Sequence, residues 1–258
     1  MNAPFDIDHT SFAVHDALGW ATRWRRELGA VPVCGEALAE FRYLLLYVGT
    51  VDGGGRLELL EPVGPGFLTR FLSARGEGPH HLTFTVPDLA KTVSRVRSLG
   101  MTVVGESYEH PPWREAFVLP DSVHGTVIQL AQSDRSYPDP HELVGSADRD
   151  PSALPSVAGA TDPFWWASLR DTPPGDPVRL GPTHLGSTRT ALSRRLFEDV
   201  LGARGSERDG FLELVWPSGS IRVHAAATPG ITGVGLLGGP ARRLGAAPGF
   251  TRGGRSPT

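Results

Sequence analysis

IDHTSFAV at residues 7–14 and HHLTFTV at residues 80–86 are two versions of one short segment. Each alternates polar and apolar residues, which is typical of a β-strand with one buried face. Each also carries a histidine near its start, His9 in the first and His81 in the second. The pair predicts an internal repeat.

Both predicted strands lead directly into an amphipathic helix, the first starting near Asp16 and the second at Asp88. Aspartate is a favoured N-cap residue. Each helix ends in Leu-Gly, so Gly29 and Gly100 lie where a left-handed C-cap is expected. The apolar positions that share one face are Ala17, Ala21, Trp24 and Leu28 in the first helix, and Leu89, Val93, Val96 and Leu99 in the second.

Three extended runs follow each helix, so the order strand, helix, three strands occurs twice within residues 1–133. One such unit has an apolar sheet face that it cannot cover alone. We therefore expect an α+β fold in which paired βαβββ modules form a curved mixed sheet around a shared cleft. The runs are 31–33, 41–48 and 56–60 in the first unit, and 102–104, 116–119 and 126–131 in the second.

The rest of the chain divides into three predicted segments. Residues 134–163 are rich in Pro and Asp and are expected to be a linker, and residues 239–258, rich in Gly, Arg and Pro, a disordered tail. Between them, residues 164–238 resemble a third βαβββ-like module without a metal site, with Gly233 expected at the histidine position of a further opening strand. Trp165 and Trp166 are expected to anchor this module on the first two.

The composition of the chain limits the classes of molecule that the protein is expected to bind. Of 258 residues, 40% are hydrophobic and 21% charged, as in ordinary globular proteins. A net charge of -3 argues against nucleic-acid binding, which leaves a small-molecule substrate. No apolar run approaches the roughly 20 residues of a membrane helix, so no membrane partner is expected. An acidic start without a signal pattern and a single cysteine, Cys34, favour the cytoplasm; a homodimer is compatible with the sequence.

Polar side chains occur at matching points of the two units. Glu58 follows His9 by 49 residues and Gln129 follows His81 by 48, and all four are expected to project from one sheet surface. Two imidazoles, a carboxylate and an amide oxygen suit a divalent Mn, Co, Ni, Fe or Zn ion with open coordination positions. A lone strand histidine is more often structural, but the repeat favours a metal site. Gln129 is either the fourth ligand or only a hydrogen-bonding residue.

Other residues are candidates for catalysis. Glu115 lies in the segment entering a strand and is a candidate for proton transfer, beside Arg114, which could hold a substrate anion. His124 lies in a turn before the last strand, where it either reaches the substrate or is simply solvated. Strand alternation places His80 on the face opposite His81, and Glu61 is expected to pair with a nearby arginine.

These residues resemble the vicinal oxygen chelate superfamily, which includes glyoxalase I, methylmalonyl-CoA epimerase, extradiol dioxygenases, and fosfomycin and bleomycin resistance proteins. The match is widest with the epimerase group, through ELLEPVGPGFLTRFLSARGEGPHHLTFTV at residues 58–86. The resemblance covers about residues 5–133 and implies metal ligands at His9, Glu58, His81 and Gln129. Family members chelate adjacent substrate oxygens and stabilise an enolate or similar anion.

The resemblance implies a metal-dependent isomerase, epimerase or lyase acting on a small oxygenated or acyl-CoA substrate, with Glu58 as ligand and base. The last ligand of the epimerases is Glu, and here it is Gln129, so a second base would have to be Glu115, Glu40 or His124. Two alternatives stay open. One is an Fe(II) extradiol-type dioxygenase using two His and one carboxylate, and the other is a metal-free protein that binds a small molecule or an antibiotic.

Overall fold

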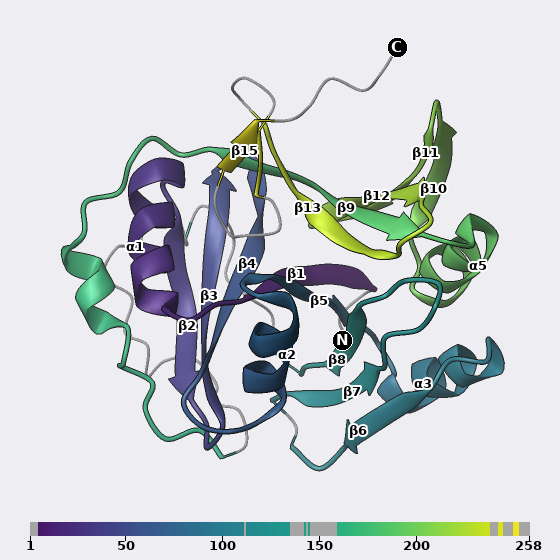
Figure 1. Ribbon diagram of the computed structural model, residues 1–258, viewed down its shortest axis with the longest axis horizontal. Helices are drawn as coiled ribbons and strands as arrows, with labels where there is room; N and C mark the ends of the chain where they lie inside the picture. The colour runs from purple at the N-terminus through teal and green to yellow at the C-terminus, as the bar shows by residue number, and fades with distance from the viewer. Residues whose placement is uncertain are drawn as a thin grey trace.

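The strands of the molecule form two mixed β-sheets, as the computed structural model shows (Figure 1). The structure describes residues 5–110, 112–134, 142, 144, 159–237, 242–244 and 250–252. Most of the predicted linker and tail lies outside these residues. The α+β class predicted from the sequence is confirmed. Within the described part of the chain, no helix is long and apolar enough to cross a membrane.

The eight-stranded sheet is built from two βαβββ units, in the strand order β2-β3-β4-β1-β5-β8-β7-β6. The two opening strands, β1 and β5, lie antiparallel at its centre, and each pairs in parallel with the last strand of its own unit. The sequence repeat is thus a structural repeat. The elements are β1 (Asp6–Ala13), α1 (Ala17–Leu28), β2 (Val31–Ala37), β3 (Phe41–Thr50) and β4 (Gly53–Pro62), then β5 (Gly78–Thr85), α3 (Leu89–Ser98), β6 (Val103–Ser107), β7 (Arg114–Val118) and β8 (Val127–Gln132).

Helices α1 and α3 begin and end as their sequences predict. The side chains of Asp16 and Asp88 accept hydrogen bonds from backbone N–H groups three residues on, which satisfies donors that the first helical turn leaves free. Gly29 and Gly100 have φ values of 65° and 81°, the left-handed conformation that glycine adopts without a steric penalty. Both helices bury the apolar face that the sequence indicates.

One helix, α2 (Phe67–Arg75), was not predicted from the sequence. It is nine residues long and follows a Pro- and Gly-rich stretch, so its apolar period is too short to stand out. Leu68 and Leu72 are buried against Ala13 and Leu60. Tertiary packing on the sheet therefore stabilises this helix and places it beside the start of β5.

The second sheet repeats the layout of one unit and the opening strand of another, in the order β10-β11-β12-β9-β13-β14-β15. β9 pairs in parallel with β12 and antiparallel with β13, as β1 pairs with β4 and β5. β14 and β15 occupy part of the tail expected to be disordered. The elements are β9 (Arg179–Ser187), α5 (Thr190–Arg194) continued by a π-helix (Arg195–Val200), β10 (Arg204–Arg208), β11 (Phe211–Trp216), β12 (Gly219–Ala225), β13 (Gly230–Leu237), β14 (Arg242–Leu244) and β15 (Phe250–Arg252).

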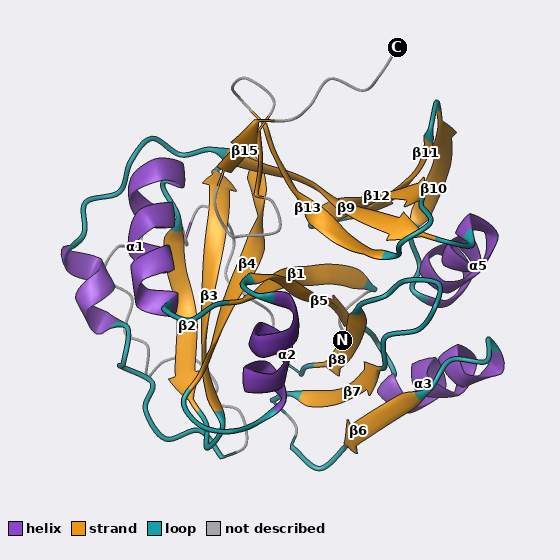
Figure 2. Ribbon diagram, in the orientation of Figure 1, coloured by secondary structure: helices purple, strands orange, loops and turns teal. Residues whose placement is uncertain are grey.

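Strands occupy the middle of the molecule, with α1 and α3 on opposite sides (Figure 2). Two buried clusters each contain residues of both sheets, so the sheets share their cores. In the first, Phe84 of β5 packs against Phe197 and Trp216 of the third unit, with ring centroids 5.8 and 5.1 Å apart. In the second, Trp166 is buried and donates from Nε1 to the carbonyl oxygen of Gly35.

Candidate metal centre

The four candidate ligands come from four adjacent strands, β4, β1, β5 and β8. Ser11 of β1 lies opposite Glu58 on one side and opposite His81 on the other. Because paired residues in a sheet point to the same face, Glu58 and His81 project beside Ser11. Two residues along β5 from His81, Thr83 lies opposite both His9 and Gln129. The register therefore directs all four predicted ligands to one surface.

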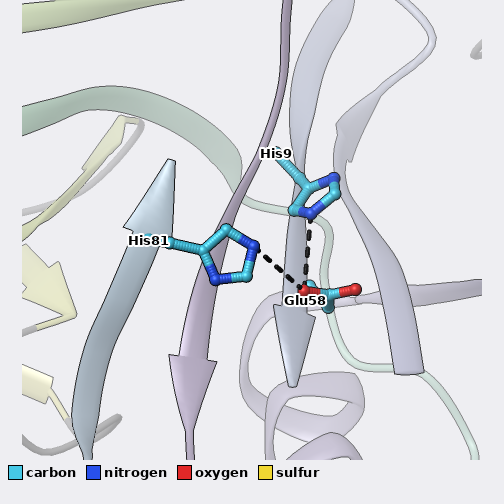
Figure 3. Close-up of side chains that lie close together, drawn as sticks. All are labelled: His9, Glu58 and His81. Atoms are coloured by element: carbon cyan, nitrogen blue, oxygen red, sulfur yellow. Dashed lines mark ion pairs between the residues drawn. The ribbon is translucent and has the colours of Figure 1, made fainter. Parts of the chain in front are cut away.

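His9, Glu58 and His81 converge so that one donor atom from each lies within 4.8 Å of the others. Oε2 of Glu58 lies 3.4 Å from Nε2 of His9 and 3.8 Å from Nε2 of His81 (Figure 3). All three side chains are buried. Among the described residues this is the one cluster of three histidine, cysteine or acidic side chains with such a spacing.

Two hydroxyl groups that sequence reasoning missed complete the cluster. Ser11 donates from Oγ to Oε2 of Glu58 at 2.6 Å, and its Oγ lies 3.0 Å from Nε2 of His81. Oγ1 of Thr83 lies 2.9 Å from Nε2 of His9. Each hydroxyl residue follows its strand histidine by two positions, which puts it on the same strand face. That repeated spacing was the signal available in the sequence.

A buried carboxylate contacts Nδ1 of His9, the ring nitrogen that faces away from the cluster. Nδ1 of His9 lies 2.6 Å from Oδ1 of Asp8, and Arg56 donates to the other oxygen of Asp8 at 3.1 Å. Burial by itself would raise the pKa of Asp8, but Arg56 and His9 outweigh it and hold this pKa below its usual range. An ionised carboxylate on Nδ1 directs Nε2 of His9 toward the cluster, an arrangement common around metal ligands.

His81 is held by a second histidine, which corrects the expectation that His80 points to the opposite face. The pairing of β1 with β5 has a register shift at this point, with Ser11 opposite His81 and Phe12 opposite Pro79. His80 is the extra residue, and such a bulge breaks the strict alternation of side chains. Nδ1 of His80 consequently lies 2.8 Å from Nδ1 of His81.

The cluster contains one ionised acid and one neutral imidazole. Burial would raise the pKa of Glu58, but the two histidines and Ser11 outweigh burial and lower this pKa below its usual value, so the carboxylate is charged. Burial would lower the pKa of His9, but Glu58 and Asp8 raise it to about 9. Burial and His80 lower the pKa of His81 to about 3. Without a cation, His9 therefore carries the charge that balances Glu58, and binding of a metal ion would release that proton.

Gln129 connects the cluster to Glu115. Its Oε1 accepts a hydrogen bond from Thr83 at 2.7 Å and lies 3.2 Å from Nε2 of His81, while its Nε2 donates to Oε2 of Glu115 at 2.7 Å. Trp113 donates to the same oxygen of Glu115 at 3.1 Å. Burial raises the pKa of Glu115. The amide oxygen of Gln129 thus faces the donor atoms, and its nitrogen fixes the carboxylate.

The remaining sequence candidates lie elsewhere. The predicted pairing of Glu61 is confirmed, because Arg42 contacts it at 2.7 Å. Arg114 donates to the carbonyl oxygen of Tyr108. His124 is buried, with Nε2 3.0 Å from Oγ of Ser193 in the third unit, so the expected catalytic role of His124 finds no support in its position. Val123 and His124 of this turn are buried because the third unit packs on them.

The family comparison agrees with this arrangement. Residues 8–117 match the model of the Glyoxalase/Bleomycin resistance protein/Dioxygenase superfamily. These residues form a domain of that superfamily. The match confirms the resemblance inferred from the sequence. It spans β1 to β7 and includes three of the four candidate ligands. No curated protein matches the sequence.

Solved structures are similar to this chain at low identity, and the first of those described next shares the fold. A 4-hydroxymandelate synthase mutant from Streptomyces coelicolor matches with 13% identity and a TM-score of 0.58, covering 92% of this chain and 71% of that one. Methylmalonyl-CoA epimerase from Mycobacterium tuberculosis matches with 27% identity and a TM-score of 0.45, covering 50% and 88%. An epimerase from Streptomyces coelicolor, in complex with 2-nitronate-propionyl-CoA, matches with 25% identity and a TM-score of 0.46, covering 53% and 99%.

The donor set fits a divalent ion of the borderline class. Two imidazole nitrogens and one carboxylate oxygen, with an amide oxygen beside them, are the ligands that Mn, Fe, Co, Ni and Zn accept. Asp8 and His80 contact the Nδ1 atoms of the two histidines, so both Nε2 atoms face the cluster, where an ion could take the place of their present hydrogen bonds. Three or four protein ligands leave coordination positions for a substrate.

Proposed function

We propose that this protein is a metal-dependent enzyme that moves a proton at a carbon atom next to a carbonyl group, in an isomerase, epimerase or lyase reaction. The observation that carries the proposal is the convergence of His9, Glu58 and His81 in a buried cluster with a second carboxylate, Glu115, beside it. A bound divalent ion would supply a Lewis acid that stabilises negative charge developing on a substrate oxygen.

The chain's own residues would then position the substrate and transfer the proton. Glu115 is the proposed proton acceptor, because it is partly buried and held by Gln129 and Trp113 in a fixed orientation. Glu58 is the proposed ligand, and its hydrogen bond from Ser11 fixes the oxygen that faces the two histidines. A small oxygenated or acyl-thioester substrate is proposed, since both provide an acidic C–H beside a carbonyl group.

The experiment is metal analysis of the purified protein, followed by proton exchange. Protein loaded with Mn, Co, Ni or Zn is incubated in D2O with acyl-CoA thioesters and small 2-oxo compounds, and NMR follows deuterium incorporation at the carbon next to the carbonyl group. Incorporation that requires both the ion and Glu115 supports the proposal. Unchanged metal-dependent deuterium incorporation in the Glu115→Gln variant would exclude Glu115 as the base.

One alternative has a specific observation in its favour. Two histidines and one carboxylate, His9, His81 and Glu58, are the ligand types of the facial triad in iron(II) oxygenases. Oxygen uptake with a catechol or a related phenol by the iron(II)-loaded protein, and no proton exchange, would assign the site to that chemistry instead. Tight binding of a small molecule by metal-free protein, with neither reaction, would indicate a sequestering protein.

A further inference from the structure

A cavity of about 490 Å³ lies beside the candidate metal centre, at the contact between the two sheets. Its walls come from α2 and the start of β5 in the first sheet, the turn before β8, and residues 228–232 at the start of β13. The third unit therefore closes a space that the paired βαβββ units alone would leave open. A pocket of this size accommodates a small organic ligand.

Beside three threonine hydroxyl groups, the cavity has two side chains that can donate hydrogen bonds to a bound molecule. Arg75, at the end of α2, is exposed there and has no carboxylate partner among the described residues. His80 also lines it, and Nε2 of His80 has no hydrogen-bond partner in the described part of the chain. Apolar walls are formed by Phe71, Pro79 and Ile231. A cation, an imidazole N–H and an apolar surface are complementary to an organic anion.

His80 connects this cavity to the metal centre. When Nε2 of His81 binds a metal ion, Nδ1 of His81 must carry a proton, and that proton faces Nδ1 of His80 at 2.8 Å. Nδ1 of His80 is then the acceptor, so the proton of His80 stays on Nε2. That N–H is available to a molecule in the cavity.

The two ligand histidines differ in what supports them. Asp8 provides a buried carboxylate at Nδ1 of His9, whereas His81 has only the neutral imidazole of His80. We propose that the cavity binds an organic carboxylate with a compact apolar body, through Arg75 and His80, and that this anion completes a carboxylate–His80–His81 relay that strengthens metal binding. The inference rests on the proposed metal site. Because binding linkage is reciprocal, the metal ion should also strengthen anion binding.

Calorimetry with benzoate on metal-free protein tests the contribution of Arg75 to binding and prevents direct coordination of the probe to a metal ion. The contribution of His80 is tested with the metal ion bound, because only then does Nδ1 of His81 carry the proton that keeps the proton of His80 on Nε2. We expect benzoate to bind at least tenfold more tightly than benzamide, which has the same shape without the charge. Arg75→Ala should weaken benzoate binding at least tenfold. Arg70→Ala is the matched control, because Arg70 is an exposed arginine on the same helix that does not line the cavity. Equal binding to both variants would overturn the proposal.

A cobalt(II) titration with and without saturating benzoate tests the relay. We expect a three- to tenfold gain in cobalt affinity in the wild-type protein, and none in His80→Phe. If His80→Phe does not fold, ¹⁵N NMR of the wild-type imidazoles replaces it, with the expected result that benzoate shifts the Nε2 signal of His80. Phenyl phosphate in place of benzoate shows whether a phosphate ester serves as well.

The outcomes separate this inference from the proposed function. If cobalt does not bind at all, the proposed metal site fails. If cobalt binds and benzoate does not, the proposed anion site and its relay are overturned and the metal site stands. If both bind but benzoate leaves cobalt affinity unchanged, only the relay is overturned. Tighter binding of benzamide than of benzoate would show an apolar cavity without anion recognition, and would also overturn it.

Discussion

Gln129 donates a hydrogen bond to Glu115 across neighbouring strands, with 2.7 Å between Nε2 and Oε2. The same amide points its oxygen toward His81 and Thr83, so one side chain orients a carboxylate and faces the candidate ligands. A glutamate at position 129 would lack the N–H that binds Glu115. This relationship gives the amide, which departs from the glutamate expected of the epimerase group, a defined structural role.

Replacement of Gln129 by Glu should change the pH dependence of activity. Two carboxylates would meet where a hydrogen bond exists, and their repulsion would raise the pKa of Glu115, which burial already raises. We expect the acidic limb of the kcat/KM profile to move to higher pH, because Glu115 must be ionised to accept a proton. An unchanged limb would show that Glu115 is not the titrating base.

Glu115→Gln should reduce proton exchange by roughly 10²–10⁴-fold, the usual contribution of a positioned general base. Metal content should not change, because Glu115 contacts Gln129 and Trp113 rather than the three converging ligands. Glu109→Gln is a suitable control, since Glu109 is an exposed carboxylate in the loop between β6 and β7. Equal activity of the two variants would exclude the proposed base.

His81→Ala should abolish tight metal binding, because it removes one of three converging donors. His9, Glu58 and the amide of Gln129 would be the remaining candidate ligands, and an amide oxygen is a weak one. Metal analysis after dialysis measures the effect. His15→Ala is the control, because the side chain of His15 is exposed. One full equivalent of metal in the His81→Ala protein would show that the site is misplaced.

The turn before β8 predicts a pH-dependent stability. Burial would raise the pKa of Asp121, but its hydrogen bonds with His124 and Val123 lower it to about 2 from a usual 3.8. A carboxyl group with a lowered folded-state pKa stabilises the protein above the unfolded value, and this contribution is lost as the pH falls from about 4 through about 2.

Asp121→Asn should accordingly lower the free energy of unfolding by ~1 kcal/mol at pH 7, after allowing for partial solvent exposure. The difference from wild type should shrink as the pH falls below about 4 and vanish only below about 2. Urea denaturation at several pH values measures it. Asp209→Asn, at an exposed turn, should leave stability within about 0.5 kcal/mol of wild type at every pH. A constant difference for Asp121→Asn would contradict the assignment to charge.

The contact between the sheets should be a major source of stability. Phe84→Ala would leave a cavity against Phe197 and Trp216, at a cost of about 3–5 kcal/mol. Phe164→Ala, which truncates a phenylalanine that is 49% exposed, should cost less than about 1 kcal/mol. Chemical denaturation compares the two. Similar costs would mean that the third unit contributes little to the folding of the first two.

The repeat was readable from the sequence because alternation and helical period are local properties. The strands around His9 and His81, the helices from Asp16 and Asp88, and the glycines that end them all depend on neighbours within a few residues. The positions of the candidate ligands followed, since matching residues of a repeat lie at matching places in a sheet. The short helix α2 was missed because only its packing on Ala13 and Leu60 stabilises it.

Tertiary structure alone decided what surrounds the ligands. The bulge that turns His80 toward His81 depends on how β1 and β5 pair, and these strands are about 70 residues apart in the chain. The burial of His124 depends on Ser193 of the third unit. Local sequence determined which residues each strand offers, whereas the register and packing between distant strands determined which of them meet, because contacts between distant segments leave no periodic signal in the sequence.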